Sequence, residues 1–327
     1  MVSRALLGLA LAGLFASCTP TFSDTTSIVG APRLLAVQAT PAEAAPGGAF
    51  AMTALYVGPA GAQDPSSIDW AICLLQKPLG DPDPISSACF VDASSGLTPL
   101  GAGGSVSGTV PSSACELFGP ESPPPAPGQP AARPTDPDGT GGFYLPVSVE
   151  SGGDQWSAAL ERIVCQPGGV TQAVSTAFSN GYVLNQNPTI ASLASLDADG
   201  GTTAIAPDAP GAGPALTVSA GQSLSLEVAW PACPSVPAAC GGAEAYVYVD
   251  PTSKQIASGR ESVVASWYAT AGTFDLDRVG RDGTDTATTV DNGWTAPTSP
   301  GPVHLWVVLR DARGGVGWGS YTLMVGP

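Results

Sequence analysis

Cysteine is the residue type whose number and spacing in this chain most directly suggest chemistry. The 327 residues include seven cysteines, and six remain once Cys18, which ends an N-terminal leader, is set aside. An even number of cysteines in an exported chain predicts disulfides. Cys233 and Cys240 flank a Pro-rich turn, PACPSVPAAC, which favours a local bridge. The other four are Cys73, Cys89, Cys115 and Cys165. They allow three pairings, and we favour the one that joins the first to the second and the third to the fourth.

His304 is the only histidine of the chain and the one candidate base for a serine hydrolase. In GPVHLWVVLR, alternation places the apolar residues 303, 305, 307 and 309 on one strand face and His304 on the other, beside Trp306. The GxSxG motif is absent, and GGSVSG at 103–108 lacks its spacing. P-loop and GxGxxG motifs are absent as well. We therefore interpret His304 as structural or solvated and expect no catalytic residue, with a secreted hydrolase of unrecognised site as the enzymatic alternative.

Three segments rich in Asp and Gly are candidates for calcium binding, because aspartate oxygens beside a glycine bend suit that ion. They are DADGG with Asp197 and Asp199, DPDGTGG with Asp136 and Asp138, and DLDRVGRDGTD at 275–285. None contains the full EF-hand pattern, and Asp-Gly is also a common turn pair. Without a CxxC pair or a second histidine, zinc is not expected either. The sequence therefore predicts no metal or other bound cofactor, with calcium as an alternative.

Acidic side chains outnumber basic ones by 27 to 11, which gives a net charge of −16 at pH 7. Nucleic acids and anionic lipid headgroups bind Lys/Arg patches, so neither is an expected partner. Hydrophobic residues make up 43% of the chain, enough for packed cores. A chain of 327 residues is expected to form two domains of ordinary size.

The leader, MVSRALLGLALAGLFASC, has the features of a secretory signal: one early arginine, an apolar run and small residues before Cys18. As a helix, the run of about 12 residues would reach about 18 Å, against a hydrocarbon core of about 30 Å. A membrane-spanning helix is therefore not expected, and residues 1–17 are predicted to be a signal peptide.

The end of the leader resembles the lipobox of bacterial lipoproteins, although Phe15 stands where that pattern prefers Leu. The resemblance implies cleavage before Cys18, which would then be the mature N-terminus and carry three acyl chains that anchor the protein in the membrane. Thr19 follows the cysteine where Asp would signal retention, which implies the outer membrane. Residues 18–31 are polar and small after the cysteine, and we expect them to form a tether.

Alternating apolar residues predict half-buried β-strands along most of the chain. Clear examples are AFAMTALYVG (49–58), IDWAICLLQ (68–76), FYLPVSVE (143–150), SLSLEVAW (223–230) and VHLWVVLR (303–310). Helical periodicity is weak. One short helix is expected within 168–181, where Asn180 and Gly181 would end it.

A faint internal repeat indicates two domains of similar fold. PRLLAVQA at Pro32 and PTIASLAS at Pro188 each precede a Gly-led alternating strand. We expect a first domain at 32–186, which includes an irregular, Pro- and Gly-rich insertion with cysteines at 80–142. The second domain would span 187–327, with Asn187–Pro188 as the hinge.

The C-terminal part resembles bacterial immunoglobulin-like and PKD-like sandwich domains. The matching phrases are SWYATAGTFD (266–275), NGWTAP (292–297), PGPVHLWVVLRDARGGVGW (300–318) and YTLMV (321–325), and the N-terminal half matches more loosely. The resemblance implies an all-β chain of two tandem immunoglobulin-like β-sandwiches. In these sandwiches we expect Trp230, Trp267 and Trp306 to be core residues, with a platform for a carbohydrate or a partner as the alternative. For Trp318, both interpretations stay open.

Together with its leader, the chain resembles surface lipoproteins of Gram-negative bacteria that have no assigned activity. The sequence thus predicts a non-enzymatic lipoprotein of the cell envelope with a structural or binding role. Its partners would be the membrane, through the lipid, and an envelope protein or a glycan. A calcium- or carbohydrate-dependent adhesion module is the first alternative.

Overall fold

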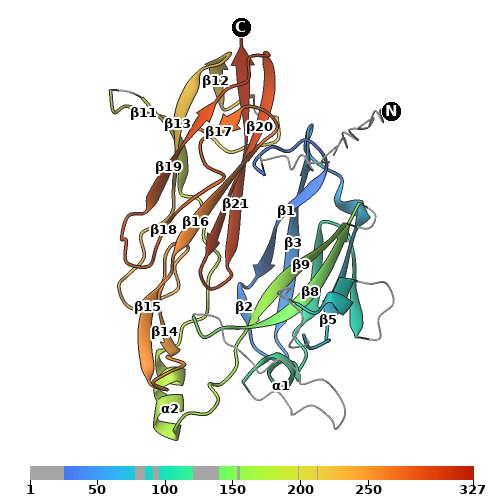
Figure 1. Cartoon of the computed structure of the whole chain (residues 1–327), viewed down its shortest axis with the longest axis vertical. Helices are drawn as coiled ribbons and strands as arrows, with labels where there is room; N and C mark the ends of the chain where they lie inside the picture. The colour runs from blue at the N-terminus through green and yellow to red at the C-terminus, as the bar shows by residue number, and fades with distance from the viewer. Residues whose placement is uncertain are drawn as a thin grey trace, which may run out of the picture.

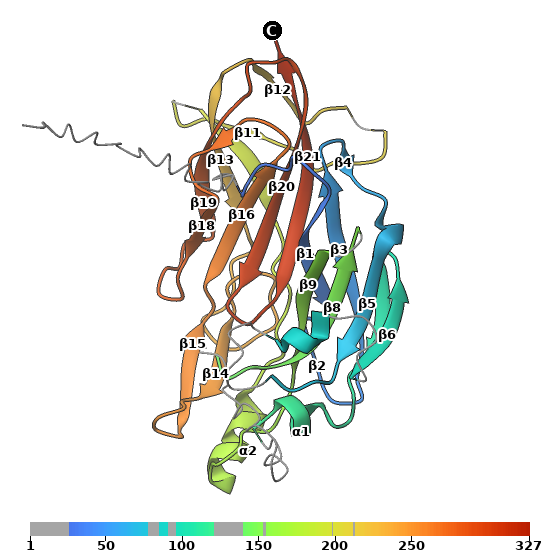
Figure 2. The same cartoon turned by 45° about the vertical axis from the view of Figure 1, so that its right-hand side comes forward.

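The computed structural model describes residues 26–77, 85–90, 96–120, 140–152, 155–197, 199–211 and 213–327. Within these ranges the regular structure is almost entirely β, arranged as two sandwiches that lie side by side (Figures 1 and 2). The predicted fold class, an all-β chain of two immunoglobulin-like sandwiches, is confirmed. Three of the candidate site residues, Cys18, Asp136 and Asp138, lie outside the described residues.

The first sandwich pairs an inner sheet, which faces the second sandwich, with an outer sheet. The inner sheet contains β1 (Arg33–Thr40), β3 (Ala49–Gly58), β4 (Gly61–Ala62) and β7 (Ser105–Thr109). The outer sheet runs in the order β2 (Glu43–Ala44), β9 (Gln155–Ile163), β8 (Phe143–Ser151), β5 (Ile68–Cys73) and β6 (Leu97–Ala102). The helical segments are η1 (Pro65–Ser67), η2 (Ser87–Phe90) and α1 (Ala114–Phe118).

Strand β3 is buried on both faces, and alternation assigns each face to a different neighbour. Phe50 and Met52 point into the core of the first sandwich, as their phase predicts. Leu55 and Val57 point the other way and belong to a separate apolar cluster that includes residues of the second sandwich. The second face of β3 is therefore buried only because the two sandwiches pack together.

The second sandwich is also built from an inner and an outer sheet. The inner sheet runs in the order β12 (Leu216–Ser219), β21 (Val316–Gly326), β20 (Gly301–Asp311), β16 (Val263–Ala269) and β18 (Arg278–Arg281). The outer sheet contains β11 (Thr202–Ala204), β10 (Ser192–Leu196), β13 (Ser223–Ala229), β19 (Thr289–Thr295) and β17 (Thr273–Phe274). A separate hairpin of β14 (Ala245–Val249) and β15 (Ile256–Arg260) lies beside α2 (Gln172–Gly181) (Figure 1).

Tryptophan packing dominates the core of the second sandwich. Trp230, Trp267 and Trp294 are each at most 2% exposed and share one apolar cluster. Leu226 and Val228 join them from β13, which confirms the half-buried strand predicted at 223–230. These large rings thus supply much of the apolar surface that is buried between the two sheets.

Helix α2 lies within the segment predicted to be helical. The hydroxyl of Thr171 caps its first turn by accepting a hydrogen bond from the N–H of Val174 at 3.4 Å. The helix ends at Gly181, as predicted, because the following residues are extended.

The expectation of an irregular insertion at 80–142 is wrong in part. Strands β6 and β7 lie inside it and pair with β5 and β3, so they are integral parts of the sandwich. Their sequences, LTPLGA and SVSGT, are rich in small and polar residues and largely exposed. Such strands carry no apolar alternation, and their register is set by the strands beside them.

The predicted tether at 18–31 is also wrong at its end. Ile28 forms a parallel β-bridge with Ala269 of β16, and Val29 is fully buried. The hydroxyl of Thr26 donates to Asp277 at 2.6 Å. The chain is therefore attached to the second sandwich before it enters β1 of the first.

Candidate functional site

The contact between the two inner sheets, which we call the junction, buries an apolar cluster of its own. Its members are Val29, Leu35, Ala36, Leu55, Val57, Trp306 and Val308. Trp306 was expected in a sandwich core, but it lies on the face of β20 opposite to Leu305 and fills the junction instead, at 2% exposure. Trp318 is half-buried against the same cluster. The outward face of β20 is thus a contact surface between sandwiches.

His304 lies at the junction as well. Its Nδ1 is 3.2 Å from the hydroxyl of Thr322, and its backbone N–H donates to Thr270 Oγ1 at 3.1 Å. A Cβ added to Gly61 of the first sandwich would lie 3.2 Å from the imidazole. The ring therefore packs between a threonine and a turn of the other sandwich, which is the position of a structural residue.

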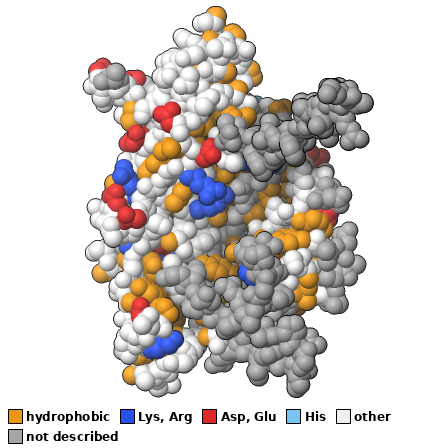
Figure 3. Space-filling view, viewed as in Figure 1, with side chains coloured by type: hydrophobic (Ala, Val, Ile, Leu, Met, Phe, Trp, Pro, Cys, Tyr) orange, Lys and Arg blue, Asp and Glu red, His pale blue; other side chains and the backbone are white. Residues whose placement is uncertain are grey.

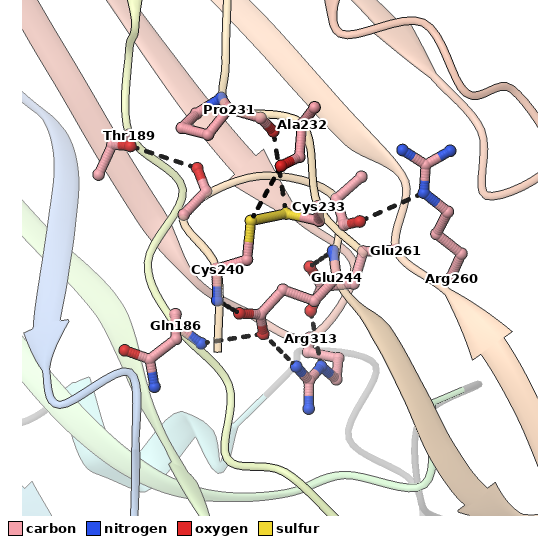
Figure 4. The surroundings of a disulfide bond; sticks show 12 residues. Gln186, Thr189, Pro231, Ala232, Cys233, Cys240, Glu244, Arg260, Glu261 and Arg313 are labelled. Atoms are coloured by element: carbon pink, nitrogen blue, oxygen red, sulfur yellow. Dashed lines mark hydrogen bonds and ion pairs between the residues drawn. A yellow bond between two sulfur atoms is a disulfide. The ribbon is translucent and has the colours of Figure 1, made fainter. Parts of the chain in front are cut away.

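Arg313, in the turn between β20 and β21, is the centre of a buried group of charges (Figure 4). Its guanidinium forms ion pairs with Glu244 at 2.5 Å and Glu261 at 2.6 Å. The third guanidinium nitrogen donates to the carbonyl of Val183 at 2.9 Å. Both glutamates are fully buried. A lone buried charge is costly, so the arginine and its two carboxylates stabilise the fold only as a set.

The turn that carries Arg313 is shaped by an aspartate and by glycines. Oδ1 of Asp311 accepts the backbone N–H groups of Arg313 and Gly315, each at 2.8 Å. A Cβ at Gly317 would lie 1.8 Å from the carbonyl oxygen of Pro188, so a side chain there would push the interdomain linker away. The DARGGVG sequence thus positions the guanidinium and lets the linker lie against the turn.

The first sandwich contributes a second group of buried charges. Glu43 of β2 lies 3.3 Å from Nε of Arg162 on β9. Its oxygens also accept the hydroxyl of Tyr182 at 2.5 Å and the N–H of Asn185 at 2.9 Å. Arg162 Nη1 donates to the backbone carbonyl of Arg313 at 3.4 Å. This bond joins the two groups across the junction.

Carboxylates outnumber arginines in the combined group, which we call the charge cluster. Its members are Glu43, Glu161, Glu244, Glu261, Asp311, Arg162 and Arg313, none more than 9% exposed. Burial, reinforced by the nearby Glu43, raises the pKa of Glu161 to about 8. Burial likewise raises the pKa of Glu261, an effect that Asp311 reinforces and Arg313 opposes. Proton uptake therefore offsets part of the excess negative charge.

Glu161 differs from the other carboxylates in the direction of its side chain. On β9 it shares the inward face with Ala159 and Ile163, which belong to the core of the first sandwich. Neither of its oxygens has a hydrogen-bond partner among the described residues. A carboxyl group in such surroundings is more stable in its neutral form.

The predicted hinge at Asn187–Pro188 is a fixed segment. The side-chain amide of Asn187 donates to the carbonyl of Ala39 at 2.6 Å and accepts the N–H of Val316 at 2.9 Å. One side chain thus bridges β1 of the first sandwich and β21 of the second. The linker holds the sandwiches together where the sequence suggested a point of movement.

Three disulfides join the cysteines in the pairs that their spacing favours. They are Cys73–Cys89, Cys115–Cys165 and Cys233–Cys240. Two of them adjoin the charge cluster. Cys165 follows β9, which carries Glu161 and Arg162, and the N–H of Cys240 donates to Glu244 (Figure 4). These two cross-links therefore support both halves of the cluster.

The aspartates considered for calcium form an ordinary turn. Oδ1 of Asp199 accepts the N–H of Gly201 at 3.2 Å, and the carbonyl of Asp197 accepts the N–H of Gly200 at 2.9 Å. Across the described ranges, no group of three or more His, Cys, Asp or Glu residues is placed to hold a metal ion. The other pair, Asp136 and Asp138, falls outside those ranges.

None of the charge-cluster residues was a candidate at the level of the sequence. Charged residues make up only 12% of the chain, so a charged residue inside a predicted strand stands out in the sequence. In ALERI, Glu161 and Arg162 are adjacent within a strand, and alternation forces one of them to face inward. A charged residue on the inward face of a predicted strand was the one indication in the sequence that a charge is buried here.

The surface carries mostly acidic charge. Figure 3 shows acidic side chains scattered along the second sandwich and basic side chains in a few small groups. None of the helices in the described part of the chain is long and apolar enough to cross a membrane.

Comparison with known proteins finds similarity at the level of solved structures. No protein-family model matches the chain, and no curated protein does. The chain is similar to the D0-D1 domain of Intimin, with 12% identity and a TM-score of 0.20, over 89% of this chain and 97% of that one. It is also similar to the Yersinia pseudotuberculosis adhesin InvE, with 12% identity and a TM-score of 0.21, over 89% of this chain and 58% of that one. Similarity at this level carries no argument about activity or partner.

Proposed function

We propose that this chain is an exported envelope protein with a non-enzymatic role, held by lipid on Cys18, whose two sandwiches act as one rigid body that displays binding surfaces. The observation that supports the proposal is the junction, where apolar and charged contacts continue into the linker and the N-terminal segment. Tandem domains that move freely share smaller and more polar contacts.

Hydrogen bonds from several elements reinforce the apolar part of the junction. Arg310 of β20 donates to the carbonyl of Leu35 at 2.8 Å, and Gln38 of β1 donates to the carbonyl of Val316 at 2.6 Å. The Asn187 bridge and the Trp306 packing lie between the same sheets. Bending at the linker would break all of these contacts at once, so the sandwiches are expected to move together.

The N-terminal segment provides a firm point of attachment for the proposed anchor. Residues 27–29 pair with β16, and the guanidinium of Arg33 lies 5.3 Å from the ring centre of Tyr268. The segment thus contacts the second sandwich immediately before it enters the first. Tension transmitted from Cys18 would pass into both sandwiches.

Lipid attachment is tested by expressing the full-length chain in a Gram-negative host supplied with an alkyne-labelled fatty acid. The wild-type protein should carry the label and fractionate with outer membranes, and Cys18→Ser should carry none. Cys233→Ser, which leaves the leader unchanged, should keep the label. An unlabelled wild-type protein would contradict the proposal.

Rigidity is tested by measuring the distance between spin labels on the two outer sheets. Thr98→Cys and Ser192→Cys place labels at exposed positions of β6 and β10. A narrow distance distribution is expected, and Trp306→Ala should broaden it by removing the central junction side chain. A broad distribution in the otherwise wild-type protein would contradict the single rigid body.

A further inference from the structure

The two sandwiches share one strand topology, so the same strand edge can be compared twice within the chain. In each sandwich a long strand pairs at its end with a short parallel strand: β9 with β2 in the first and β21 with β12 in the second. In the facing sheet, β1 pairs with β3 and β10 pairs with β13. Strands β9 and β21 are therefore equivalent, and so are β1 and β10.

The outer edge of β9 is paired only at the end of the strand. There the N–H of Val164 donates to the carbonyl of Ala44 of β2 at 3.0 Å. Backbone groups of alternate residues point to the same edge, so Leu160 and Ala158 direct theirs to this side, and Pro146 opposite Leu160 on β8 has no N–H to donate. Within the described ranges, the backbone N–H and C=O groups of Ala158 and Leu160 have no hydrogen-bond partner.

This open edge lies along a recess of about 560 Å³. Residues 157–160 of β9 and residues 34–37 of β1 line it, together with residues 310–312 at the end of β20. Leu160, which is 38% exposed, contributes apolar surface to the lining. The recess thus combines unpaired backbone with an exposed aliphatic side chain.

Strand β1 presents unpaired backbone to the same recess. The carbonyl of Leu35 points away from β3 and accepts the guanidinium of Arg310 at 2.8 Å. The carbonyl of Ala39 points the same way and accepts the side-chain amide of Asn187 at 2.6 Å. Val37 stands between them, so alternation directs its backbone groups to this side as well. Its N–H and C=O groups have no partner among the residues that the structure describes.

In the second sandwich, the chain itself covers the equivalent edge. After β10, the N–H of Ile205 donates to the carbonyl of Leu193 on β10 at 2.8 Å. Further along, the N–H of Asp208 donates to the carbonyl of Ser320 on β21, also at 2.8 Å. The side chain of Ile205 is 3% exposed and belongs to the core. One short segment thus bonds to both strands and inserts an apolar side chain into the sandwich.

The connection in the first sandwich is too short to provide such a cover. Only Pro41 and Ala42 separate β1 from β2, whereas residues 197–215 separate β10 from β12. Two residues can cross from one sheet to the other, but they cannot also run along an edge. The recess between β1 and β9 is therefore open at the place where Ile205 lies between β10 and β21.

We infer that the recess binds an extended segment of a protein partner, which adds to the edge of β9 as a strand and inserts an aliphatic side chain between β1 and β9. This inference rests on the proposed binding role and names its partner class. In strand addition, backbone hydrogen bonds supply affinity, and a pocket for alternate side chains supplies specificity. The recess offers both, and it continues the junction, since Leu35 and Ala36 line the recess and belong to the junction's apolar cluster.

A single segment suits the recess better than a second copy of the chain does. Each copy carries a net charge of −16, so two copies repel each other. The recess also lies beside the second sandwich, which contributes Arg310 and Asp311 to its lining. A strand that belongs to a folded sheet would bring the rest of that sheet against the second sandwich, whereas a segment without neighbouring strands would not.

The probe for the test is the chain's own covering segment, residues 202–209, as the fluorescein-labelled peptide TTAIAPDA. Fluorescence anisotropy measures its affinity for the intact protein. The control peptide carries an N-methyl group on the backbone nitrogen of its aspartate, so it cannot donate the bond that Asp208 gives to Ser320. The control should bind at least about fivefold more weakly, as expected for one lost backbone hydrogen bond.

Three variants locate the peptide on the protein, with thermal melting as the check that each one is folded. Ala158→Pro removes an N–H that faces the recess and keeps the bonds to β8, so affinity should fall by about fivefold or more. Leu160→Lys places a charge at the edge and should lower affinity by about threefold or more. Leu276→Lys changes another exposed leucine, which does not line the recess, and should bind as the wild type does. If Ala158→Pro does not fold, the two lysine variants decide the comparison.

The amide signal of Leu160 shows by NMR whether the edge is free. In protein labelled with nitrogen-15 leucine, this signal is identified by its loss in Leu160→Lys. Its proton should exchange with solvent at least about tenfold faster than that of Leu145, which lies in the centre of the β8–β9 ladder. Addition of the probe peptide should slow the exchange at Leu160 and leave that at Leu145 unchanged.

Three results would overturn the inference. They are equal or absent binding of the two peptides, equal binding by the wild type and Leu160→Lys, or a Leu160 amide that is already protected in the free protein. In the last case the chain or a second copy covers the edge, and sedimentation velocity distinguishes the two. A missing fatty-acid label on Cys18 would overturn the proposed anchoring and leave these measurements unaffected. Failure of the recess and failure of the proposed function are therefore distinguishable.

Discussion

The two halves of the charge cluster satisfy their buried carboxylates in opposite ways. In the second sandwich, Arg313 contacts Glu244 and Glu261 at 2.5 and 2.6 Å (Figure 4). In the first, Arg162 lies 3.3 Å from one carboxylate, while Glu161 turns into the apolar core without a described partner. One half is thus a set of tight ion pairs and the other contains an isolated acid.

This difference separates two uses of buried charge. Paired charges define geometry, because separating them leaves an uncompensated ion in the interior. An isolated buried acid takes up a proton and makes stability depend on pH. We therefore expect the second-sandwich half to hold the junction in register and the first-sandwich half to set its response to pH.

The largest loss of stability is expected when Arg313, the central residue of the second-sandwich half, is replaced. Arg313→Met leaves two fully buried glutamates without their cation and should lower the free energy of unfolding by roughly 3–5 kcal/mol. Urea unfolding at neutral pH measures the loss, and hydrogen exchange should increase in the linker at 182–187. A loss below about 1 kcal/mol would show that the paired half is not structural.

Arg281→Met is the matched control for that variant. Arg281 forms an ion pair with Asp285 at 3.1 Å, but both side chains are more than a third exposed, at 35% and 39%. Exposed pairs contribute little, so this variant should cost about 1 kcal/mol or less.

The disulfides beside the two halves should differ in their contributions. Cys115–Cys165 joins residues 50 apart, and Cys233–Cys240 joins residues 7 apart. Loop-closure entropy predicts about 4 kcal/mol for the longer loop and about 2 kcal/mol for the shorter. Replacing each pair with alanines and measuring urea unfolding tests the order. Equal losses would mean that the local surroundings of each bond outweigh loop length.

The first-sandwich half, which contains Glu161, should make the stability of the protein depend on pH. The pKa of Glu161 is raised from 4.5 to about 8 by burial, so between these values the folded protein keeps a proton that the unfolded chain has lost. This contribution to stability is complete below about pH 4.5 and falls by at most about 1.4 kcal/mol per unit as pH rises to about 8. Glu161→Gln cannot titrate, so its urea stability should fall by about 2 kcal/mol less than that of the wild type between pH 6 and pH 8.

Glu227→Gln provides the comparison for the pH series, because Glu227 lies on the outward face of β13. Its stability curve should run parallel to that of the wild type. If Glu161→Gln also ran parallel, the buried acid would not be the source of the pH dependence.

A small loss of stability is expected from a change in the linker, at Tyr182, which contacts the first-sandwich half of the charge cluster. Tyr182→Phe removes the hydroxyl that donates to Glu43 but leaves the Asn185 N–H and Arg162 beside that carboxylate. The cost should be about 1 kcal/mol in urea unfolding. A loss as large as that of Arg313→Met would show that the linker, and not the ion pairs, controls the junction.

Local patterns predicted the regular parts of the fold well. The strands at 223–230 and 303–310 and the helix within 168–181 follow from alternation and spacing. Strands β6 and β7 were missed because their small, polar residues carry no such pattern. Trp306 was assigned to the wrong contact because periodicity shows which face a residue shares and does not show what covers that face.

By itself, the sequence determined an all-β chain with two sandwich cores, since strand alternation depends only on neighbouring residues. The tertiary structure alone decided that the sandwiches pack side by side and that their linker and N-terminal segment join both. Those features depend on contacts between distant segments, as between Arg162 and the carbonyl of Arg313, 151 residues apart. Whether a charge is buried and paired, and hence its pKa, is set by such contacts and by no local pattern.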